Sequence, residues 1–211
     1  MDKETKITIR SYNDTVKSFV KRTDPLHPKP LSDIFLKLIK NKAKILDLGC
    51  AQGRDTKYFL DKSYDVVGVD LSEKLIENAI QKYPEAKFEI MDIRDLKFPE
   101  NTFDAIWANA ILVHIPKKEI HKTLQGIKRI MKDDGIMMVC VKTKKDGKNS
   151  ETYEKDKRHE NVNKFWSYFS EIEFKEYLEN VGFQVIKIIK KNYSNEDRNY
   201  NWINLFCRNK N

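Results

Sequence analysis

The sequence is poor in the residues that mark unusual classes of protein. Its 211 residues include only three cysteines, six prolines and seven glycines, so a disulfide-rich scaffold, a collagen-like chain and a low-complexity chain are excluded. No apolar run approaches the roughly 18 residues of a membrane span, and residues 1–10 lack the apolar stretch of a secretory signal. Hydrophobic residues make up 40% of the chain, which suffices for the packed core of one domain spanning residues 1–211.

The few cysteines also indicate the compartment. Cys50, Cys140 and Cys207 are odd in number and far apart, which is typical of a reducing environment, and we expect the protein to be cytoplasmic. The four histidines share no metal-ligand spacing with each other or with the cysteines. We therefore expect no metal site.

Charge, in contrast, is abundant and unevenly placed. Lysine and arginine outnumber aspartate and glutamate by 40 to 32, giving a formal charge of +8. Residues 42–141 are balanced, so the whole excess lies in residues 1–41 and 142–211. Such flanks indicate either ordinary solvated surface or contact with an anionic partner.

Short apolar runs rich in isoleucine and valine alternate with amphipathic stretches, as parallel strands buried on both faces do. Strands are predicted over residues 43–49, 65–70, 87–93, 103–109 and 135–141. Two further runs, 183–189 and 202–208, lie too close together for a helical crossover, so they predict a hairpin with an antiparallel last strand.

Helical patterns occupy the intervening segments. Ser72 can cap a helix that ends before Pro84. Ser170 and Glu173 form a capping box for a helix that stops at Gly182. Other helices are predicted to begin near Arg54, to follow the apolar stripe from Ile120 to Met131, and to precede the sheet at about 12–21 and 31–41.

The alternation of strands and helices predicts an α/β fold with a doubly wound, Rossmann-like sheet and helices on both faces. The longest polar segment, residues 143–168, is long enough to be a functional lid. In such sheets, ligands bind outside the carboxyl ends of the strands.

The first predicted strand runs into a glycine loop, DLGCAQGRD at residues 47–55. Glycine lets the backbone approach a ligand, and the helix after the loop offers its first N–H groups. A dinucleotide loop reads G-x-G-x-x-G, whereas this chain has Ala51 and Arg54 in place of the second and third glycines. Asp47 would not favour a pyrophosphate, but it would stabilise the ammonium and sulfonium charges of S-adenosylmethionine.

Two further acids end the next two predicted strands. Asp70 follows Gly49 at the spacing at which a carboxylate binds ribose hydroxyls. Asp92 ends the third strand, where its carboxylate can accept a hydrogen bond from an adenine amino group. The position of Asp70 fits NAD and S-adenosylmethionine equally. The glycine loop favours S-adenosylmethionine.

With these motifs the chain resembles the class I S-adenosylmethionine-dependent methyltransferases, and within them the small-molecule, tellurite-resistance-like and methyltransferase-domain group. The resemblance rests on ILDLGCAQGRD (45–55), VVGVDLS (66–72), MDIRDLKFPENTFDAIWANAILVHIP (91–116) and IKRIMKDDG (127–135). It implies a seven-stranded sheet with an antiparallel last strand. It also implies an N-terminal helical lid (1–41), a cofactor-binding core (42–141) and a substrate-side segment with the closing hairpin (142–211).

The resemblance further implies S-adenosyl-L-methionine as cofactor, S-adenosyl-L-homocysteine as product, and a role for each motif residue. The methionyl part would be held by Asp47, Gly49, Cys50, Ala51, Gly53 and Arg54, the ribose by Asp70, the adenine by Leu71, Asp92 and Ile93, and the amino group by the carbonyl of Asn109, with Tyr12 closing over the cofactor. The family usually has glycine where Ala51 stands, and we expect binding to survive the extra methyl group.

Methyl transfer needs an aligned nucleophile, and a base only where the acceptor must lose a proton. His114 is the candidate base because an imidazole titrates near neutral pH. The alternative is that His114 packs against its neighbours and only supports its loop. The other candidates for the acceptor side are Glu151, Tyr153 and His159, which could also be solvated surface, and Trp166 and Phe169, which could also be core.

We expect a small-molecule acceptor that is anionic, because the basic flanks cover the acceptor side in the fold that this chain resembles. An RNA acceptor, especially a tRNA base, is the alternative that the charge suggests, although no appended RNA-binding module is visible. A non-catalytic S-adenosylmethionine-binding protein also remains open, and a dehydrogenase is disfavoured by the missing glycines. We expect no membrane association and either a monomer or a homodimer.

Overall fold

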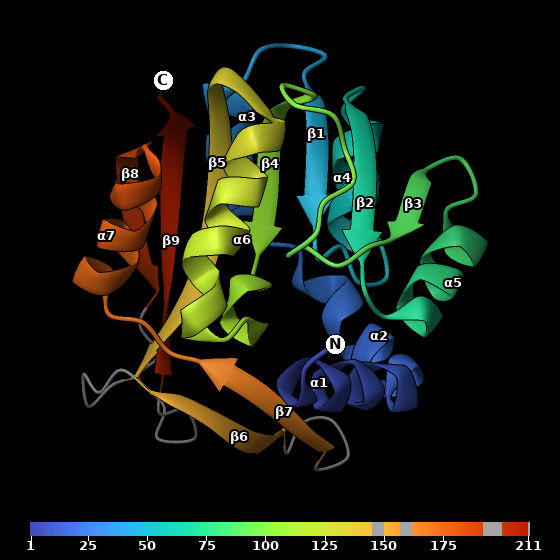
Figure 1. Ribbon diagram of the computed structural model, residues 1–211. Coiled ribbons are helices and arrows are strands. Elements are labelled where there is room, and N and C mark those ends of the chain that lie inside the picture. Colours follow the sequence, from blue (N-terminus) through green and yellow to red (C-terminus); the bar gives the residue numbers. More distant parts are fainter. Residues whose placement is uncertain (145–149, 157–161, 192–199, 211) are drawn as a thin grey trace.

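Seven strands form one mixed sheet with helices on both faces in the computed structural model of the chain (Figure 1). The structure describes residues 1–144, 150–156, 162–191 and 200–210. The strand order is β3-β2-β1-β4-β5-β9-β8, and β9 runs antiparallel to both of its neighbours. The strands of this sheet are β1 (Lys44–Leu48), β2 (Asp65–Asp70), β3 (Lys87–Ile90), β4 (Phe103–Asn109), β5 (Met131–Lys144), β8 (Phe183–Lys191) and β9 (Tyr200–Asn209). The predicted fold class and the antiparallel last strand are confirmed.

The helices begin and end where local capping chemistry places them. Ser72 accepts a hydrogen bond from the backbone of Leu75, and Ser170 and Glu173 form the predicted capping box. Gly182 ends its helix with φ of 98°, in the left-handed region that glycine tolerates best. The α-helices are α1 (Lys3–Asp14), α2 (Val16–Thr23), α3 (Lys29–Leu38), α4 (Arg54–Asp61), α5 (Glu73–Lys82), α6 (Lys117–Ile130) and α7 (Glu171–Val181).

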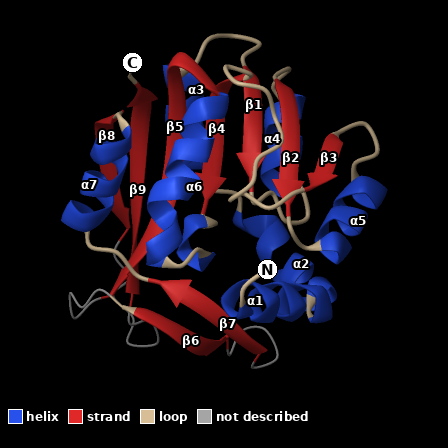
Figure 2. Ribbon diagram, in the orientation of Figure 1, coloured by secondary structure: helices blue, strands red, loops and turns tan. Residues whose placement is uncertain are grey.

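Helices cover both faces of the sheet (Figure 2). Two apolar cores hold these layers together, one on each face of the sheet. Alternate residues of β1 point to opposite faces, so Leu46 belongs to the core with α6 and α7, while Ile45 belongs to the core with α3 and α4. Both side chains are fully buried. The central strands are therefore apolar on both faces, and only their ends carry polar side chains that can form a site.

The N-terminal helices differ from the prediction. A helix over 12–21 was expected, but α1 begins at Lys3 and a break at Thr15 separates it from α2. Asp2 caps α1 by accepting a hydrogen bond of 2.7 Å from the backbone of Thr5. The buried face of α1 consists of Thr5, Thr8 and Ser11, so apolar periodicity gave no signal there.

The polar segment 143–168 contains a two-stranded antiparallel hairpin that the sequence did not predict. It consists of β6 (Glu151–Asp156) and β7 (Val162–Ser167), and β7 lies beside α1 at the end of the sheet where the parallel strands finish (Figure 1). The Phe165 backbone N–H donates to Thr8 Oγ1 at 3.1 Å. The hairpin and the first helices thus cover the carboxyl ends of the strands together. Among the described residues, no helix is long and apolar enough to cross a membrane.

Candidate functional site

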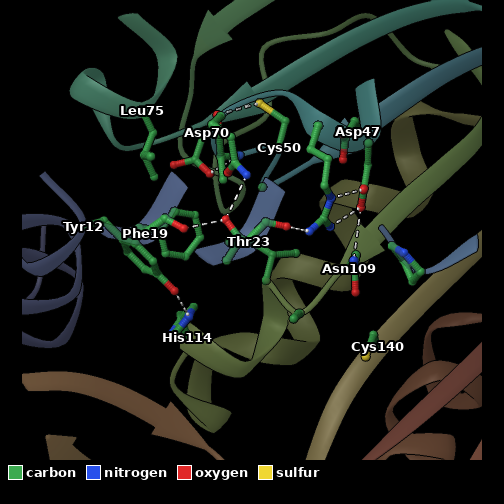
Figure 3. A pocket seen from close by; sticks show the side chains of 18 of the residues that line it. Tyr12, Phe19, Thr23, Asp47, Cys50, Asp70, Leu75, Asn109, His114 and Cys140 are labelled. Atoms are coloured by element: carbon green, nitrogen blue, oxygen red, sulfur yellow. Dashed lines mark hydrogen bonds and ion pairs between the residues drawn. The ribbon is translucent and has the colours of Figure 1, made fainter. Parts of the chain in front are cut away.

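A cavity of about 690 Å³ lies at the carboxyl ends of the parallel strands, and residues of α1, α2 and β7 complete its wall. Figure 3 shows side chains of its wall, among them Asp47, Asp70, Asn109, Tyr12 and His114. Every residue predicted to contact the cofactor lines this cavity except Gly53. The predicted residues that the structure brings together are Tyr12, Asp47, Gly49, Cys50, Ala51, Arg54, Asp70, Leu71, Asp92, Ile93, Asn109 and His114.

The glycine loop is shaped by close approach of the backbone to its neighbours. Gly49 has φ of +75°, and a Cβ atom there would lie 2.6 Å from the side chain of Ile111. Gly53 has φ of +79°, and a Cβ atom there would lie 2.5 Å from Phe88. Gly53 therefore shapes the turn into α4 and does not line the cavity. Ala51 also adopts a positive φ, 49°, so its methyl group is accommodated at some cost in backbone strain.

Asp47 is the buried acid at the end of β1. Its Oδ2 accepts a hydrogen bond of 2.6 Å from the hydroxyl of Thr56, and the residue is only 2% exposed. Burial, reinforced by the negative charge of Asp55, raises the pKa of Asp47 to about 8. A cationic ligand beside this carboxyl would favour its ionised form.

Asp70 ends β2 and braces the glycine loop. One carboxylate oxygen accepts from the Ala51 N–H at 3.0 Å, and the other accepts from the Ser72 N–H at 2.8 Å. Burial outweighs these hydrogen bonds and raises the pKa of Asp70. Each oxygen keeps a second lone pair, so the carboxylate can also accept from hydroxyl groups of a ligand in the cavity.

Asp92, just beyond β3, is held by a charged partner that the sequence did not reveal. The guanidinium of Arg94 contacts the Asp92 carboxylate at 2.6 and 2.9 Å and also binds Asp2 and Glu119. Burial acts to raise the pKa of Asp92, but the bonds from Arg94 outweigh it and lower that pKa. Because Asp2 caps α1, Arg94 ties the N-terminal helix to this edge of the cavity.

Asp55 is the most densely bonded acid of the site, and it was not predicted as a site residue. Its carboxylate accepts from Arg54 at 2.7 and 3.0 Å, from Trp107 at 2.9 Å and from the Asn109 side chain at 3.1 Å, and it contacts His27 Nδ1 at 3.0 Å. Burial alone would raise the pKa of Asp55, but these partners hold it well below its usual range. The Asp in GRD, next to the arginine, was the signal available in the sequence.

The same bonds determine what Arg54 can do. Two of its nitrogens hold Asp55, and Nη1 donates to the backbone carbonyl of Thr23 at 2.8 Å. Arg54 therefore joins the glycine loop to the end of α2. Its guanidinium lines the cavity, but its bonding capacity is largely spent on protein groups.

Tyr12 and His114 meet across the cavity. The Tyr12 hydroxyl lies 3.0 Å from His114 Nε2, and His114 Nδ1 lies 2.8 Å from the carbonyl oxygen of Phe165. A carbonyl can only accept, so Nδ1 carries a proton, and whenever the imidazole is neutral Nε2 is the nitrogen that accepts from Tyr12. His114 is thus oriented with its basic nitrogen toward Tyr12 and the cavity.

Comparison with known proteins shows what the central part of the chain is similar to. Residues 45–135 match the methyltransferase domain family. The match includes the glycine loop, Asp70, Asp92 and Asn109, so the part of the chain that ends the parallel strands is similar to a methyltransferase domain. The cofactor of this family is S-adenosylmethionine, as the sequence motifs predicted.

Individual methyltransferases are similar to this chain at moderate identity. A phosphoethanolamine N-methyltransferase of Triticum aestivum is 30% identical over 121 residues, which are 54% of this chain and 23% of that protein. The chain spans between 17% and 51% of the lengths of the first curated relatives that it matches.

Two solved structures share the fold over most of the chain. The 1,6-didemethyltoxoflavin-N1-methyltransferase of Burkholderia thailandensis, with S-adenosylhomocysteine bound, has a TM-score of 0.72 at 20% identity and covers 96% of this chain and 85% of its own. A TehB-like methyltransferase of Corynebacterium glutamicum has a TM-score of 0.69 at 20% identity and covers 95% of this chain and all of its own.

The other half of the cavity wall has a different composition. Its wall contains Lys142 and Trp202 from β5 and β9, and Lys164 and Trp166 from β7. Trp166 was a candidate for the acceptor wall, whereas Lys142 and Lys164 were not predicted. A buried lysine in a polar stretch has no distinguishing sequence signal, because the same letters usually describe solvated surface.

Several candidates for the acceptor side do not line the cavity. The Tyr153 hydroxyl donates to Glu4 at the surface, Glu151 accepts from the Lys117 backbone, and Phe169 is fully buried in the core. His159 lies outside the described residues. The cysteines are free and buried, and burial raises the pKa of Cys50, so Cys50 packs in the loop and is no nucleophile. Within the described ranges, no group of three or more His, Cys, Asp or Glu residues could hold a metal ion.

Proposed function

We propose that this protein transfers a methyl group from S-adenosylmethionine to a small-molecule acceptor by in-line displacement. The observation that carries the proposal is one cavity whose wall contains both the acids at the ends of β1, β2 and β3 and the Tyr12–His114 pair. The small size of the cavity, about 690 Å³, supports a small acceptor beside the cofactor.

The residues present fit the cofactor on physical grounds. The backbone of the glycine loop is brought to the cavity surface at Gly49, where a side chain would collide with Ile111. Asp47 is a buried acid whose carboxylate accepts a hydrogen bond from the neutral hydroxyl of Thr56, and the ligand's ammonium would supply a cationic partner. We assign the ribose hydroxyls to Asp70, and the adenine to Leu71, Asp92 and Ile93.

Bound S-adenosylmethionine would supply a methyl group activated by its positive sulfur. The protein then has to align the acceptor, exclude water and, where needed, take up a proton. We assign the proton to Nε2 of His114, which the Phe165 carbonyl orients. Tyr12 covers the cofactor and, through its hydroxyl, can pass the acceptor's proton to that nitrogen.

The proposal divides the chain by task. Residues 1–41 would act as the lid, residues 42–141 as the cofactor-binding core and residues 142–211 as the acceptor side. The three free cysteines support a reducing compartment such as the cytoplasm.

Calorimetry with S-adenosylhomocysteine tests the first half of the proposal. Folded protein should bind it, and Asp70→Ala should weaken binding by about tenfold or more, since hydrogen bonds to a charged group are lost. Absence of binding in protein of native circular dichroism would contradict the proposal.

Turnover tests the second half. S-adenosylhomocysteine production should appear with at least one member of a small-molecule acceptor library. His114→Asn should lower kcat and remove the acidic limb of the pH–rate profile while cofactor affinity stays within about twofold. Tight cofactor binding without turnover on small molecules or on tRNA would favour the non-catalytic reading.

A further inference from the structure

Three residues in register on neighbouring strands lead into the acceptor half, the part of the cavity walled by the ends of β5, β7, β8 and β9. Asn109 on β4 pairs with Cys140 on β5, and Cys140 pairs with Asn204 on β9. All three residues line the cavity. Because neighbouring strands lie about 4.8 Å apart, Asn204 lies about 10 Å from Asn109, where we expect the amino group of the cofactor.

The same face of the sheet is apolar one step further from the cavity. Two positions from the first row, Trp107, Met138 and Phe206 form a second row that is paired in the same way and fully buried in the core with α3 and α4. Side chains two positions apart on a strand point to the same face. Asn204 is therefore an amide at the point where this core ends and the cavity begins.

One hydrogen bond fixes the orientation of the Asn204 side chain. The residue is 2% exposed, and its Nδ2 donates to the backbone carbonyl of Ile189 on β8 at 3.0 Å. A carbonyl only accepts, so the amide nitrogen must be the atom that faces Ile189. Within the described residues, this bond leaves one N–H donor and the oxygen acceptor of the amide for a ligand.

Apolar side chains extend the wall around this amide. Trp202, two positions before Asn204 on β9, lines the cavity, and Leu31 of α3 lines it and packs against the same apolar core. Pro28 and Pro30 add surface that carries no backbone N–H donor. These four residues offer contact area with few hydrogen bonds, which suits a planar, apolar ligand body.

We propose that Asn204 is a specificity-determining residue for the acceptor, which carries a lactam or amide edge on a planar, uncharged body. The Asn204 amide pairs with the N–H and C=O of that edge, and the apolar body lies against Trp202 and Leu31. The methyl-accepting atom faces the other end of the row, at Asn109. The inference rests on the proposed function, because Asn204 lines the same cavity.

The binding test uses the complex with S-adenosylhomocysteine and four probes. 2-Quinolone has a lactam edge on two fused rings, quinoline lacks the lactam, 2-pyridone lacks the second ring, and quinoline-2-carboxylate carries a negative charge. In a ligand-observed NMR titration, 2-quinolone should bind saturably and about tenfold more tightly than quinoline, because it adds two hydrogen bonds. It should also bind more tightly than 2-pyridone, which buries less apolar surface. Equal or tighter binding of any other probe, or no saturable binding of 2-quinolone, overturns the proposal.

A variant with a matched control assigns the effect to the amide. Asn204→Leu keeps a similar volume without polar atoms, so it should bind 2-quinolone about tenfold more weakly and quinoline unchanged. Asn209→Leu is the control, because Asn209 is also 2% exposed on β9 and its Nδ2 donates to the carbonyls of Met131 and Lys132, yet it lies outside the cavity wall. Loss of the lactam preference in both variants, or in neither, would mean that Asn204 acts through the fold alone.

The apolar contact has its own test on α3. Leu31→Ala should weaken 2-quinolone several-fold and 2-pyridone by less than about twofold, since the smaller probe reaches less of the wall. Leu38→Ala is the control, because Leu38 is 37% exposed at the other end of α3 and lies outside the wall. Equal losses for both probes in Leu31→Ala would contradict the placement of the apolar body.

Two further measurements keep the outcomes separable. S-adenosylhomocysteine affinity is measured first on every protein, so failure of wild type to bind it counts against the proposed function, and normal binding with no lactam preference counts against the role of Asn204. If Asn204→Leu does not fold, Asn204→Ser replaces it, because a serine hydroxyl is too short to take the place of the amide. Asn204→Ser should show the same loss of preference, and a retained preference would overturn the proposal.

Discussion

The hydroxyl of Tyr12 and Nε2 of His114, 102 positions apart in the chain, lie 3.0 Å from each other. The contact joins α1 to the loop after β4, and the bond from His114 Nδ1 to the Phe165 carbonyl adds β7. One imidazole therefore connects the N-terminal helices, the loop after β4 and the hairpin. Binding of the cofactor, orientation of the base and position of the hairpin should be coupled through it.

A double-mutant cycle measures this coupling. Tyr12→Phe and His114→Leu should each lower the free energy of unfolding, and the pair should be less than additive by about 0.5–1.5 kcal/mol, the net contribution of one hydrogen bond. Urea denaturation supplies the four values. Tyr12→Phe combined with Tyr58→Phe is the control cycle, because the Tyr58 hydroxyl instead lies 3.3 Å from Asp33; additivity in both cycles would contradict the coupling.

Protons should be released when the cofactor product binds. The pKa of Asp47 is raised to about 8, first by burial and then by Asp55, so most molecules carry a neutral Asp47 at pH 7. The ammonium group of S-adenosylhomocysteine favours the ionised carboxyl, so binding at pH 7 should release about one proton. Calorimetry in phosphate and in imidazole buffer gives this number from the difference in heat.

The sign of the pH dependence follows from the same pKa. Affinity should rise between pH 6 and pH 8, because less work is needed to ionise Asp47 as its pKa is approached. In the unliganded protein the raised pKa has the opposite effect: the contribution of Asp47 to stability falls as pH rises from about 4 to 8. Asp47→Asn should bind more weakly and release no proton; equal heats for wild type in both buffers would count against the assignment.

Glycine-to-alanine substitutions should have opposite effects on the free energy of unfolding in the glycine loop and inside a helix. Gly49→Ala should lower the free energy of unfolding by about 2–4 kcal/mol, because a positive φ and a 2.6 Å approach to Ile111 both oppose the new methyl group. Gly126, inside α6, has no atom within 4 Å of a Cβ position, so Gly126→Ala should raise it by about 0.5–1 kcal/mol. Thermal and urea unfolding check both signs.

Ala51 offers the reverse experiment. Its φ of 49° is costly for alanine, so Ala51→Gly should raise the free energy of unfolding by about 0.5–1 kcal/mol. Binding of S-adenosylhomocysteine should change by less than about twofold, since the loop already has the required shape. A lower stability of this variant would show that the methyl group packs favourably.

The sheet and the grouping of acids in one half of the cavity were predictable because strand ends carry local signals. Runs of buried residues ended at Asp47, Asp70 and Asn109, and the parallel order of the strands brings such ends to one edge. Capping chemistry at Ser72 and Ser170 likewise depends on residues three positions apart. These features are determined mainly by interactions between residues that are close together in the sequence.

The acceptor half was not predictable because it is built from distant contacts. The polar face of α1 is buried only because β7 covers it, as in the bond from Phe165 to Thr8. Lys142 and Lys164 read as surface residues until the rings of Trp166 and Tyr12 are placed over them. The role of Asp55 depends on Trp107, which comes from another strand.

Arg94 provides the last prediction, which concerns the N-terminal helix. Its guanidinium contacts the carboxylates of Asp2, Asp92 and Glu119, and its side chain is 14% exposed. Burial acts to raise the pKa values of Asp2 and Asp92, but their bonds to Arg94 and the backbone lower both. Arg94→Met should therefore lower the free energy of unfolding at pH 7 by about 1–3 kcal/mol, because three acids would lose their shared cation.

The loss in Arg94→Met should depend on pH in one direction. Acids with lowered pKa values stabilise the folded protein above their unfolded pKa near 4, and this contribution disappears as pH falls through the folded values. The difference between wild type and Arg94→Met should thus be full at pH 7 and smaller at pH 3, where the unfolded acids have begun to take up protons and part of the contribution is lost, measured by urea denaturation. Lys97→Met is the control, since Lys97 and its partner Asp95 are each 70% exposed, and its effect should stay below about 0.5 kcal/mol. A loss of equal size at both pH values would mean that Arg94 acts by packing its stem, and that α1 is not held by this charge cluster.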